Sequence, residues 1–137
     1  MTSPAPVPSR PRDGFRAVAG MVCAAQAVTL LGFVVFYLWE LTQGSGGDVA
    51  RVVMSALLIA VFAVGIAAMA RGWLRGDNWP NTPTVVWNLL LLPVGWSLVQ
   101  GGHGLLGALV ILVALVGIVA AIRADTRDRE DTEVSAD

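Results

Sequence analysis

The sequence predicts an all-α, polytopic membrane protein with four transmembrane helices arranged as two antiparallel hairpins. Three observations lead to this fold class: an apolar composition, four long stretches without charge, and arginines gathered on one side of these stretches. Hydrophobic residues make up 55% of the 137-residue chain and charged residues only 14%, whereas a soluble domain has about 25% charged residues. The length leaves room for one domain.

Four stretches of the chain contain no Asp, Glu, Lys, Arg or His, namely residues 17–38, 52–70, 85–99 and 105–122. A helix needs roughly 20 apolar residues to cross a bilayer, and the third stretch reaches this length once Thr82, Pro83 and Thr84 form its first turn. A soluble bundle would show polar faces at helical spacing, and these stretches show none. We therefore expect spans at about 15–41, 49–70, 82–100 and 104–122.

The two ends of the chain are polar. Residues 1–14 contain four prolines together with Ser, Thr and Gly, a composition typical of a disordered arm. Residues 124–137 contain six acidic residues and two arginines, which predicts a disordered acidic tail. The transmembrane domain is accordingly expected over residues 15–123.

The arginines predict the orientation of the four spans. All nine basic residues are arginines. Eight of them lie before the first span, between the second and third, or after the fourth, and only Arg51 lies on the other side. Because basic residues are retained on the cytoplasmic side of a membrane, we expect both termini in the cytoplasm.

The third span carries polar groups that an apolar helix does not need. Asn88, Pro93, Ser97 and Gln100 interrupt it, and an unpaired amide or a freed carbonyl group is costly in hydrocarbon. We therefore expect this helix to face other protein. Gln26, at depth in the first span, also needs a partner, and Asn88 is a candidate. These five residues are the candidate ligand or helix-packing contacts, and hydrogen bonding between helices would explain them without any ligand.

Four tryptophans are candidate anchors at the membrane interface, where this residue type is enriched. They are Trp39, Trp73, Trp79 and Trp96, all near span ends. The single cysteine, Cys23, lies inside the first span, so the chain offers neither a disulfide framework nor a cysteine-rich metal site.

The chain also contains a candidate internal duplication. The pattern W-x-L-x-Q-G begins at Trp39 near the end of the first span and at Trp96 near the end of the third. Residues 56–71 align without a gap to residues 108–123, with nine of sixteen positions identical. Apolar helices also match by chance, so both explanations stay open. A genuine parallel repeat would bring Trp39 close to Trp96.

Function is expected only as a class. Pumps, proton-coupled transporters and ion channels usually keep an ionisable group at depth, and none of the four spans has one. The sequence shows no nucleophile–base set, metal-ligand spacing or phosphate loop, so we expect no enzyme, no catalytic residue, no metal and no cofactor. We expect the chain to work in the lipid bilayer through helix–helix association, as a homo-oligomer or an accessory subunit of a membrane complex, without nucleic acid. Small-residue stripes on the second and fourth spans favour this, because they exceed what one bundle can bury.

Two alternatives remain. The chain could be a small transporter or permeation unit for a neutral or lipophilic solute, lined by Asn88, Pro93, Ser97 and Gln100 of the third span. It could also be a sensor whose acidic tail recruits a cytoplasmic partner.

The segment Arg71–Gly102 carries a W-N-x4-P-x2-W-S-x2-Q pattern that starts at Trp87. This segment, about a quarter of the chain, resembles uncharacterised small four-span integral membrane proteins of actinobacteria. The resemblance implies a location in the plasma membrane of a bacterium and no particular activity.

Overall fold

The computed structural model describes residues 14–44 and 48–135, which form four helices. They are α1 (Gly14–Thr42), α2 (Val49–Arg75), α3 (Asn81–Gln100) and α4 (Gly104–Val134). All four are long and apolar enough to cross a membrane, as the fold class predicted. The arm expected over residues 1–14 lies, apart from Gly14, outside the described residues.

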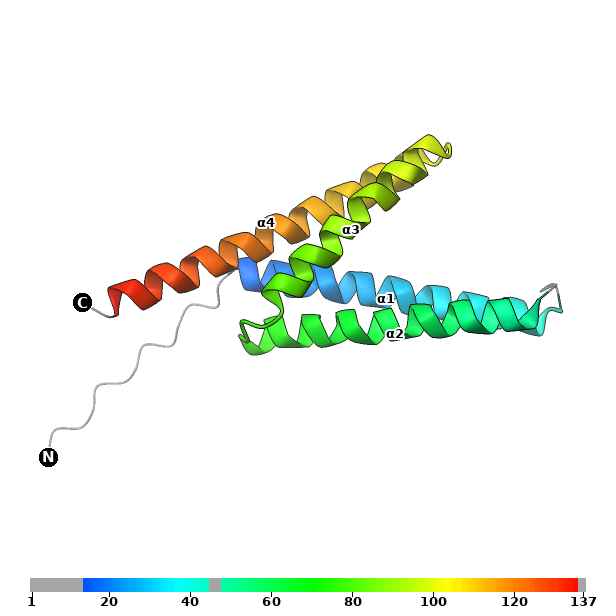
Figure 1. Ribbon diagram of the computed structural model, residues 1–137, viewed down its shortest axis with the longest axis horizontal. Coiled ribbons are helices and arrows are strands. Elements are labelled where there is room, and N and C mark those ends of the chain that lie inside the picture. The colour runs from blue at the N-terminus through cyan, green and yellow to red at the C-terminus, as the bar shows by residue number, and fades with distance from the viewer. Residues whose placement is uncertain (1–13, 45–47, 136–137) are drawn as a thin grey trace, which may run out of the picture.

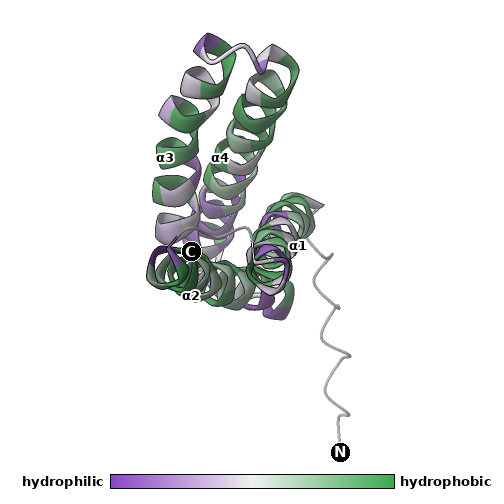
Figure 2. Ribbon diagram, turned by 90° about the vertical axis from the view of Figure 1, so that its right-hand side faces the viewer, coloured by the Kyte–Doolittle hydropathy of each residue, from purple (hydrophilic) through white to green (hydrophobic). Residues whose placement is uncertain are grey.

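The helices pack as two hairpins that meet at one end. α1 packs on α2, α3 packs on α4, and α1 also packs on α4, whereas α2 and α3 share little contact although they are adjacent in the chain. The hairpins approach each other where α1 begins and α4 leaves the bundle, and they diverge toward their loops (Figures 1 and 2). The molecule therefore has the shape of a V.

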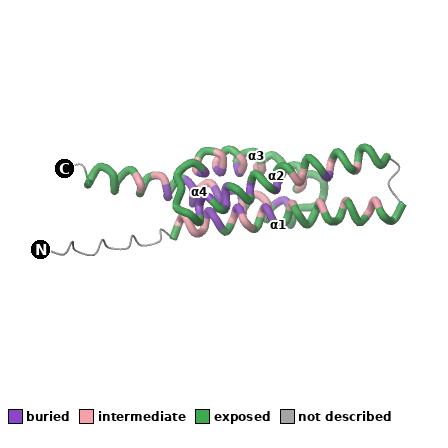
Figure 3. Tube along the Cα trace, turned by 90° about the horizontal axis from the view of Figure 1, so that it is seen from below, coloured by how far each residue is buried: buried purple, intermediate pink, exposed green. Residues whose placement is uncertain are grey.

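The core consists mainly of small side chains and lies where the two hairpins meet. On α1, Ala19, Cys23 and Ala27 follow one another at intervals of four residues and are buried, so they form one face of that helix. They pack in a cluster with alanines near the end of α4, among them Ala120 and Ala121. Figure 3 shows that burial is concentrated in this region, while the far ends of α1 and α2 are largely exposed.

The divergence of the hairpins corrects one expectation that was drawn from the internal duplication. A parallel repeat was expected to bring Trp39 and Trp96 together at the loop ends of the spans. In the structure their exposed fractions are 59% and 61%, and they belong to hairpins whose loop ends lie far apart (Figure 1). The helix-to-helix match of the two hairpins thus does not extend to contact between their loop ends.

The acidic tail is a second correction. Residues 124–137 were expected to be disordered, but α4 continues without a break to Val134. This segment contains no proline or glycine, and Arg129 pairs with Asp125 one helical turn away at 3.2 Å. Pairs of opposite charge at this spacing support a helix. The high charge therefore keeps the segment polar without preventing it from being helical.

The α3–α4 hairpin depends on a close approach between two glycines. A Cβ atom added to Gly107 of α4 would lie 2.5 Å from the carbonyl oxygen of Gly95 and 2.8 Å from the backbone nitrogen of Val99, both on α3. A Cβ atom on Gly95 would lie 2.6 Å from a side-chain carbon of Ile111. The two backbones are thus nearly in contact, which only residues without a side chain permit.

We predict that Gly107→Ala destabilises the protein by about 1–3 kcal/mol, because the added methyl group forces the hairpin apart. The loss should appear even though alanine raises intrinsic helix stability by up to about 1 kcal/mol over glycine. The measurement is reversible unfolding in mixed detergent micelles, followed by tryptophan fluorescence. Gly32→Ala is the matched control, because no atom lies within 4 Å of a Cβ atom at Gly32. Equal stabilities for the two variants would contradict the close approach.

Candidate functional site

The amide of Asn88 links the two hairpins at the centre of the molecule. Asn88 is fully buried. Its Oδ1 accepts a hydrogen bond of 2.9 Å from Gln26 Nε2 on α1, and its Nδ2 donates one of 2.8 Å to the carbonyl oxygen of Thr84, one turn earlier in α3. The sequence offered Asn88 as a partner for Gln26, and the structure joins these two side chains.

A glycine on α4 makes room for the Asn88 side chain. A Cβ atom added to Gly117 would lie 2.8 Å from each of the three terminal atoms of that side chain. Asn88 is therefore enclosed by α1 on one side and by the bare backbone of α4 on the other. This packing fixes the position of the amide as well as its hydrogen bonds.

The hydroxyl group of Thr84 is a second point of connection, and the sequence analysis did not identify it. Thr84 is fully buried, and its Oγ1 accepts a hydrogen bond of 2.9 Å from Trp73 Nε1 of α2. The same oxygen lies 3.9 Å from Met69 Sδ and 3.8 Å from Cys23 Sγ. One hydroxyl group thus contacts side chains from α1 and α2. Thr84 sits in the first turn of α3, where a threonine is ordinarily interpreted as an interfacial residue.

The position of Trp73 differs from the expectation for an interface anchor. Its exposed fraction is only 3%, because its ring lies on the face of α2 that belongs to the core and its N–H group binds Thr84. The other three candidate anchors are well exposed, at 59% for Trp39, 55% for Trp79 and 61% for Trp96. Trp73 is therefore a core residue, whereas the other three have the exposure that an anchor needs.

The remaining polar residues of α3 lie apart from Asn88. Pro93, Ser97 and Gln100 are all exposed. They follow one another at intervals of four and three residues and so share one face of the helix. The expectation that α3 faces other protein throughout thus holds within this chain only for its first half. The four candidate residues of the third span do not come together in one site.

Three buried side-chain atoms have no hydrogen-bond partner within residues 14–44 and 48–135. They are Gln26 Oε1, Asn81 Oδ1 and Trp87 Nε1. Gln26 therefore satisfies one of its polar atoms through Asn88 and leaves the other unpaired. A buried polar group without a partner lowers stability by about 1–3 kcal/mol, so the central network is not optimised for stability alone.

A second polar cluster holds the hairpins together near the chain ends. The guanidinium group of Arg16, at the start of α1, donates hydrogen bonds to the carboxylate of Asp128 on α4 and to Oδ1 of Asn78. It also donates to the carbonyl oxygen of Asp77 at 3.4 Å and lies 5.9 Å from the ring centre of Trp73. One side chain thus connects α1, the α2–α3 connection and the extension of α4.

The ring of Phe15 adds an apolar contact to this cluster. The guanidinium groups of Arg123 and Arg127 lie 5.5 Å and 5.0 Å from its centre, within the range of a cation–π interaction. These two arginines belong to α4 and Phe15 to α1, so they fasten the α4 extension to the first turn of α1. The extension is therefore docked on the bundle.

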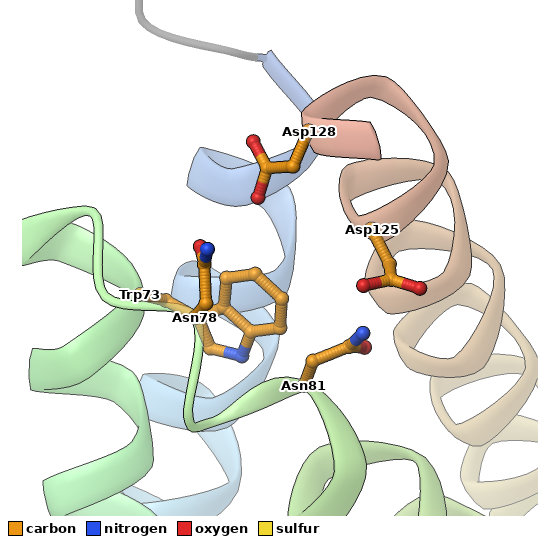
Figure 4. A pocket seen from close by; sticks show the side chains of 5 residues that line it. All are labelled: Trp73, Asn78, Asn81, Asp125 and Asp128. Carbon is orange, nitrogen blue, oxygen red and sulfur yellow. The ribbon is translucent and has the colours of Figure 1, made fainter. Parts of the chain in front are cut away.

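Figure 4 shows the small cavity beside this cluster, lined by Trp73, Asn78, Asn81, Asp125 and Asp128. Its volume is about 10 Å³, which leaves room for about one water molecule. The side chains of Asn81 and Asp125 point toward each other across it (Figure 4). The cavity is thus too small for an organic ligand.

No family model, curated protein or solved structure matches this chain. What the two clusters can do must therefore be argued from their chemistry. The central network consists of uncharged amide, hydroxyl and indole groups, and the outer one of a guanidinium group with its oxygen partners. Among the described residues, no three His, Cys, Asp or Glu side chains gather as a metal site would require. Both clusters join helices that are distant in the sequence.

We predict that Gln26 and Asn88 stabilise the fold jointly. In a double-mutant cycle, Gln26→Ala and Asn88→Ala should each destabilise the protein, with a coupling energy of about 0.6–2 kcal/mol, as for other hydrogen bonds between membrane helices. The measurement is again unfolding in mixed micelles. Gln100→Ala removes an exposed amide from the same helix and should change stability by less than about 0.5 kcal/mol. Strict additivity of the two alanine substitutions would show that the pair makes no contribution.

We further predict that Arg16→Met destabilises the protein by about 1.5–3 kcal/mol, because Arg16 makes hydrogen bonds to a carboxylate across two elements. Methionine preserves the apolar part of the side chain. Arg129→Met is the control: Arg129 is 77% exposed and pairs only within α4, so its loss should cost at most about 0.5 kcal/mol. Hydrogen exchange of residues 124–134 should accelerate in the first variant alone. Unchanged exchange there would contradict docking of the α4 extension by Arg16.

Proposed function

We propose that this protein is a non-enzymatic integral membrane protein of a bacterial plasma membrane that acts through helix–helix association. It would do so as a self-associating unit or as an accessory subunit of a larger membrane complex. Four helices long and apolar enough to cross a membrane support the placement in a bilayer. The short resemblance around Trp87 supports kinship with small four-span membrane proteins of actinobacteria.

The exposed polar face of α3 carries this proposal. Ser97 and Gln100 present a hydroxyl group and an amide on the outside of the molecule, and Pro93 removes the hydrogen bond to the carbonyl group of Leu89, a residue that is 56% exposed. In hydrocarbon such groups are costly without partners. In this half of α3 only α4 packs against the helix, so the partner would come from another chain.

The small-residue stripes contribute less to association than the sequence suggested. Ala56 and Ala63 of α2 are buried within this chain. On α4 the buried small residues are Gly107, Ala114, Gly117, Ala120, Ala121 and Ala124. Most of these small residues therefore hold the four helices of one chain together, which leaves the outer half of α3 as the surface that still lacks a partner.

The arginines support the proposed orientation, with both termini in the cytoplasm. Arg16 at the start of α1 contacts Asp128 on the extension of α4, so these two helix ends lie at the same end of the molecule (Figure 1). Arg51, the one arginine assigned to the other side of the membrane, pairs with Asp48 at 3.8 Å beside the α1–α2 loop.

The alternative of a permeation unit for a neutral or lipophilic solute finds less support. Its path would be lined by Asn88 together with Pro93, Ser97 and Gln100. Asn88 is enclosed between α1 and α4, whereas the other three lie on the exposed face of α3. A solute that followed the exposed residues would therefore not meet Asn88.

The test is to replace both polar side chains of the exposed face, Ser97→Leu with Gln100→Leu. Each lost hydrogen bond between helices is worth about 0.6–2 kcal/mol, so association should weaken about tenfold or more, since 1.4 kcal/mol corresponds to a factor of ten. The measurement is energy transfer between labelled copies in vesicles, together with recovery of membrane partners from native membranes.

Thr29→Val is the matched control. Thr29 is an exposed polar residue of α1 whose hydroxyl group bonds to the carbonyl oxygen of Ala25 within its own helix, so association should not change. A wild-type protein that remains a lone monomer and recovers no membrane partner would refute the proposal. So would a double variant that associates as strongly as the wild type.

A further inference from the structure

An apolar groove runs between α2 and α3 at the closed end of the V. These two helices follow each other in the chain but pack on different partners, α1 and α4, so the space between them is not filled by either. The groove has a volume of about 250 Å³. The lining residues that matter here are Phe62, Gly65 and Met69 from α2 and Val86, Trp87 and Leu90 from α3.

The walls of the groove are formed by rings and aliphatic side chains. The ring centres of Phe62 and Trp87 lie 5.4 Å apart with a tilt of 32°, so the two rings make a continuous aromatic wall from α2 to α3. At Gly65 a Cβ atom would have no neighbour within 4 Å, so this glycine keeps the groove open. Phe62, Val86 and Leu90 are exposed by 46%, 51% and 59%, which places the opening on the outer surface of the bundle.

The size of the groove decides what kind of occupant it accepts. One turn of an α-helix with side chains, about 10 Å across and 5.4 Å long, fills roughly 400 Å³, which exceeds the 250 Å³ of the groove. A methylene group is similar in size to a water molecule, which takes up about 30 Å³ in the liquid. The groove therefore accommodates about eight methylene groups but not a helix of another chain.

The chemistry of the lining narrows the occupant further. All the lining residues are apolar, and none offers a charge to a headgroup or an amide to a polar solute. The groove lies within the spanning part of α2 and α3, so in a bilayer the material at its opening is lipid hydrocarbon. We propose that this groove binds one hydrocarbon chain of a membrane lipid, seated on Gly65 against Phe62 and Trp87. This inference rests on the proposed placement in a bilayer but not on helix–helix association.

A chain in this groove differs from the lipid that surrounds any membrane protein. It contacts protein on both sides and on the floor, so it gains dispersion contacts that a lipid on a flat helix face does not have. We therefore expect it to exchange more slowly than the surrounding lipid and to remain with the protein in mild detergent.

The test uses the full chain in vesicles of a phosphatidylcholine whose acyl chains carry bromine, which quenches tryptophan fluorescence on contact. The contribution of Trp87 is obtained as the difference between each protein and its Trp87→Phe counterpart. Gly65→Leu fills the groove, so the quenching of Trp87 should fall by roughly half, since the chain is displaced from contact distance. Native mass spectrometry should show a retained lipid in the wild type and its loss in the variant.

Gly32→Leu is the matched control, because Gly32 is an equally open and exposed glycine on α1; it should preserve both signals. The smaller Gly65→Val replaces Gly65→Leu if the circular dichroism of the leucine variant departs from that of the wild type. Unchanged quenching and unchanged lipid retention in a folded Gly65 variant would overturn the proposal. A Gly65 variant that dissociates an oligomer while the quenching stays the same would also overturn it, because the groove would then seat a second copy. Failure of the wild type to enter vesicles at all would instead refute the bilayer placement, which separates the two failures.

Discussion

The structure depends on the requirement that a buried amide must find partners. Asn88 meets it by binding Gln26 across the junction of the two hairpins and the carbonyl oxygen of Thr84 within its own helix. Gly117 lets α4 close over the pair. Apolar side chains gain little from one another where the surrounding lipid is equally apolar. The few polar contacts and the close backbone approaches therefore have an unusually large part in setting the arrangement of the helices.

Most of the helical layout could be predicted from the sequence, and the reason is physical. Long stretches without charge must span, and their number and spacing follow directly from the printed residues. The pairing of Gln26 with Asn88 could also be anticipated, because few side chains at that depth need a partner. Thr84 and Trp73 could not be identified in this way. Both lie near span ends, where the same residue types occur at the interface, and only the rotation of each helix decides that they face inward.

Two further features lie beyond what composition and alignment can indicate. The charged segment after Arg123 resembles a disordered tail by composition, yet it is helical because it lacks helix breakers and docks on α1 through Asp128, Arg123 and Arg127. The match between residues 56–71 and 108–123 describes similar helices but contains no information on the angle between hairpins. That angle is set by where the contacts between hairpins occur, and these are confined to one end of the molecule.

The V-shaped arrangement has a consequence for the membrane itself. In a bilayer, a bundle that is narrow at one end and wide at the other displaces more lipid from one leaflet than from the opposite leaflet. Lateral pressure in the crowded leaflet then acts on the angle between the hairpins, and the resistance to that pressure comes from the contacts at the narrow end. Changes in lipid shape or membrane curvature would therefore couple mechanically to this molecule through its geometry alone.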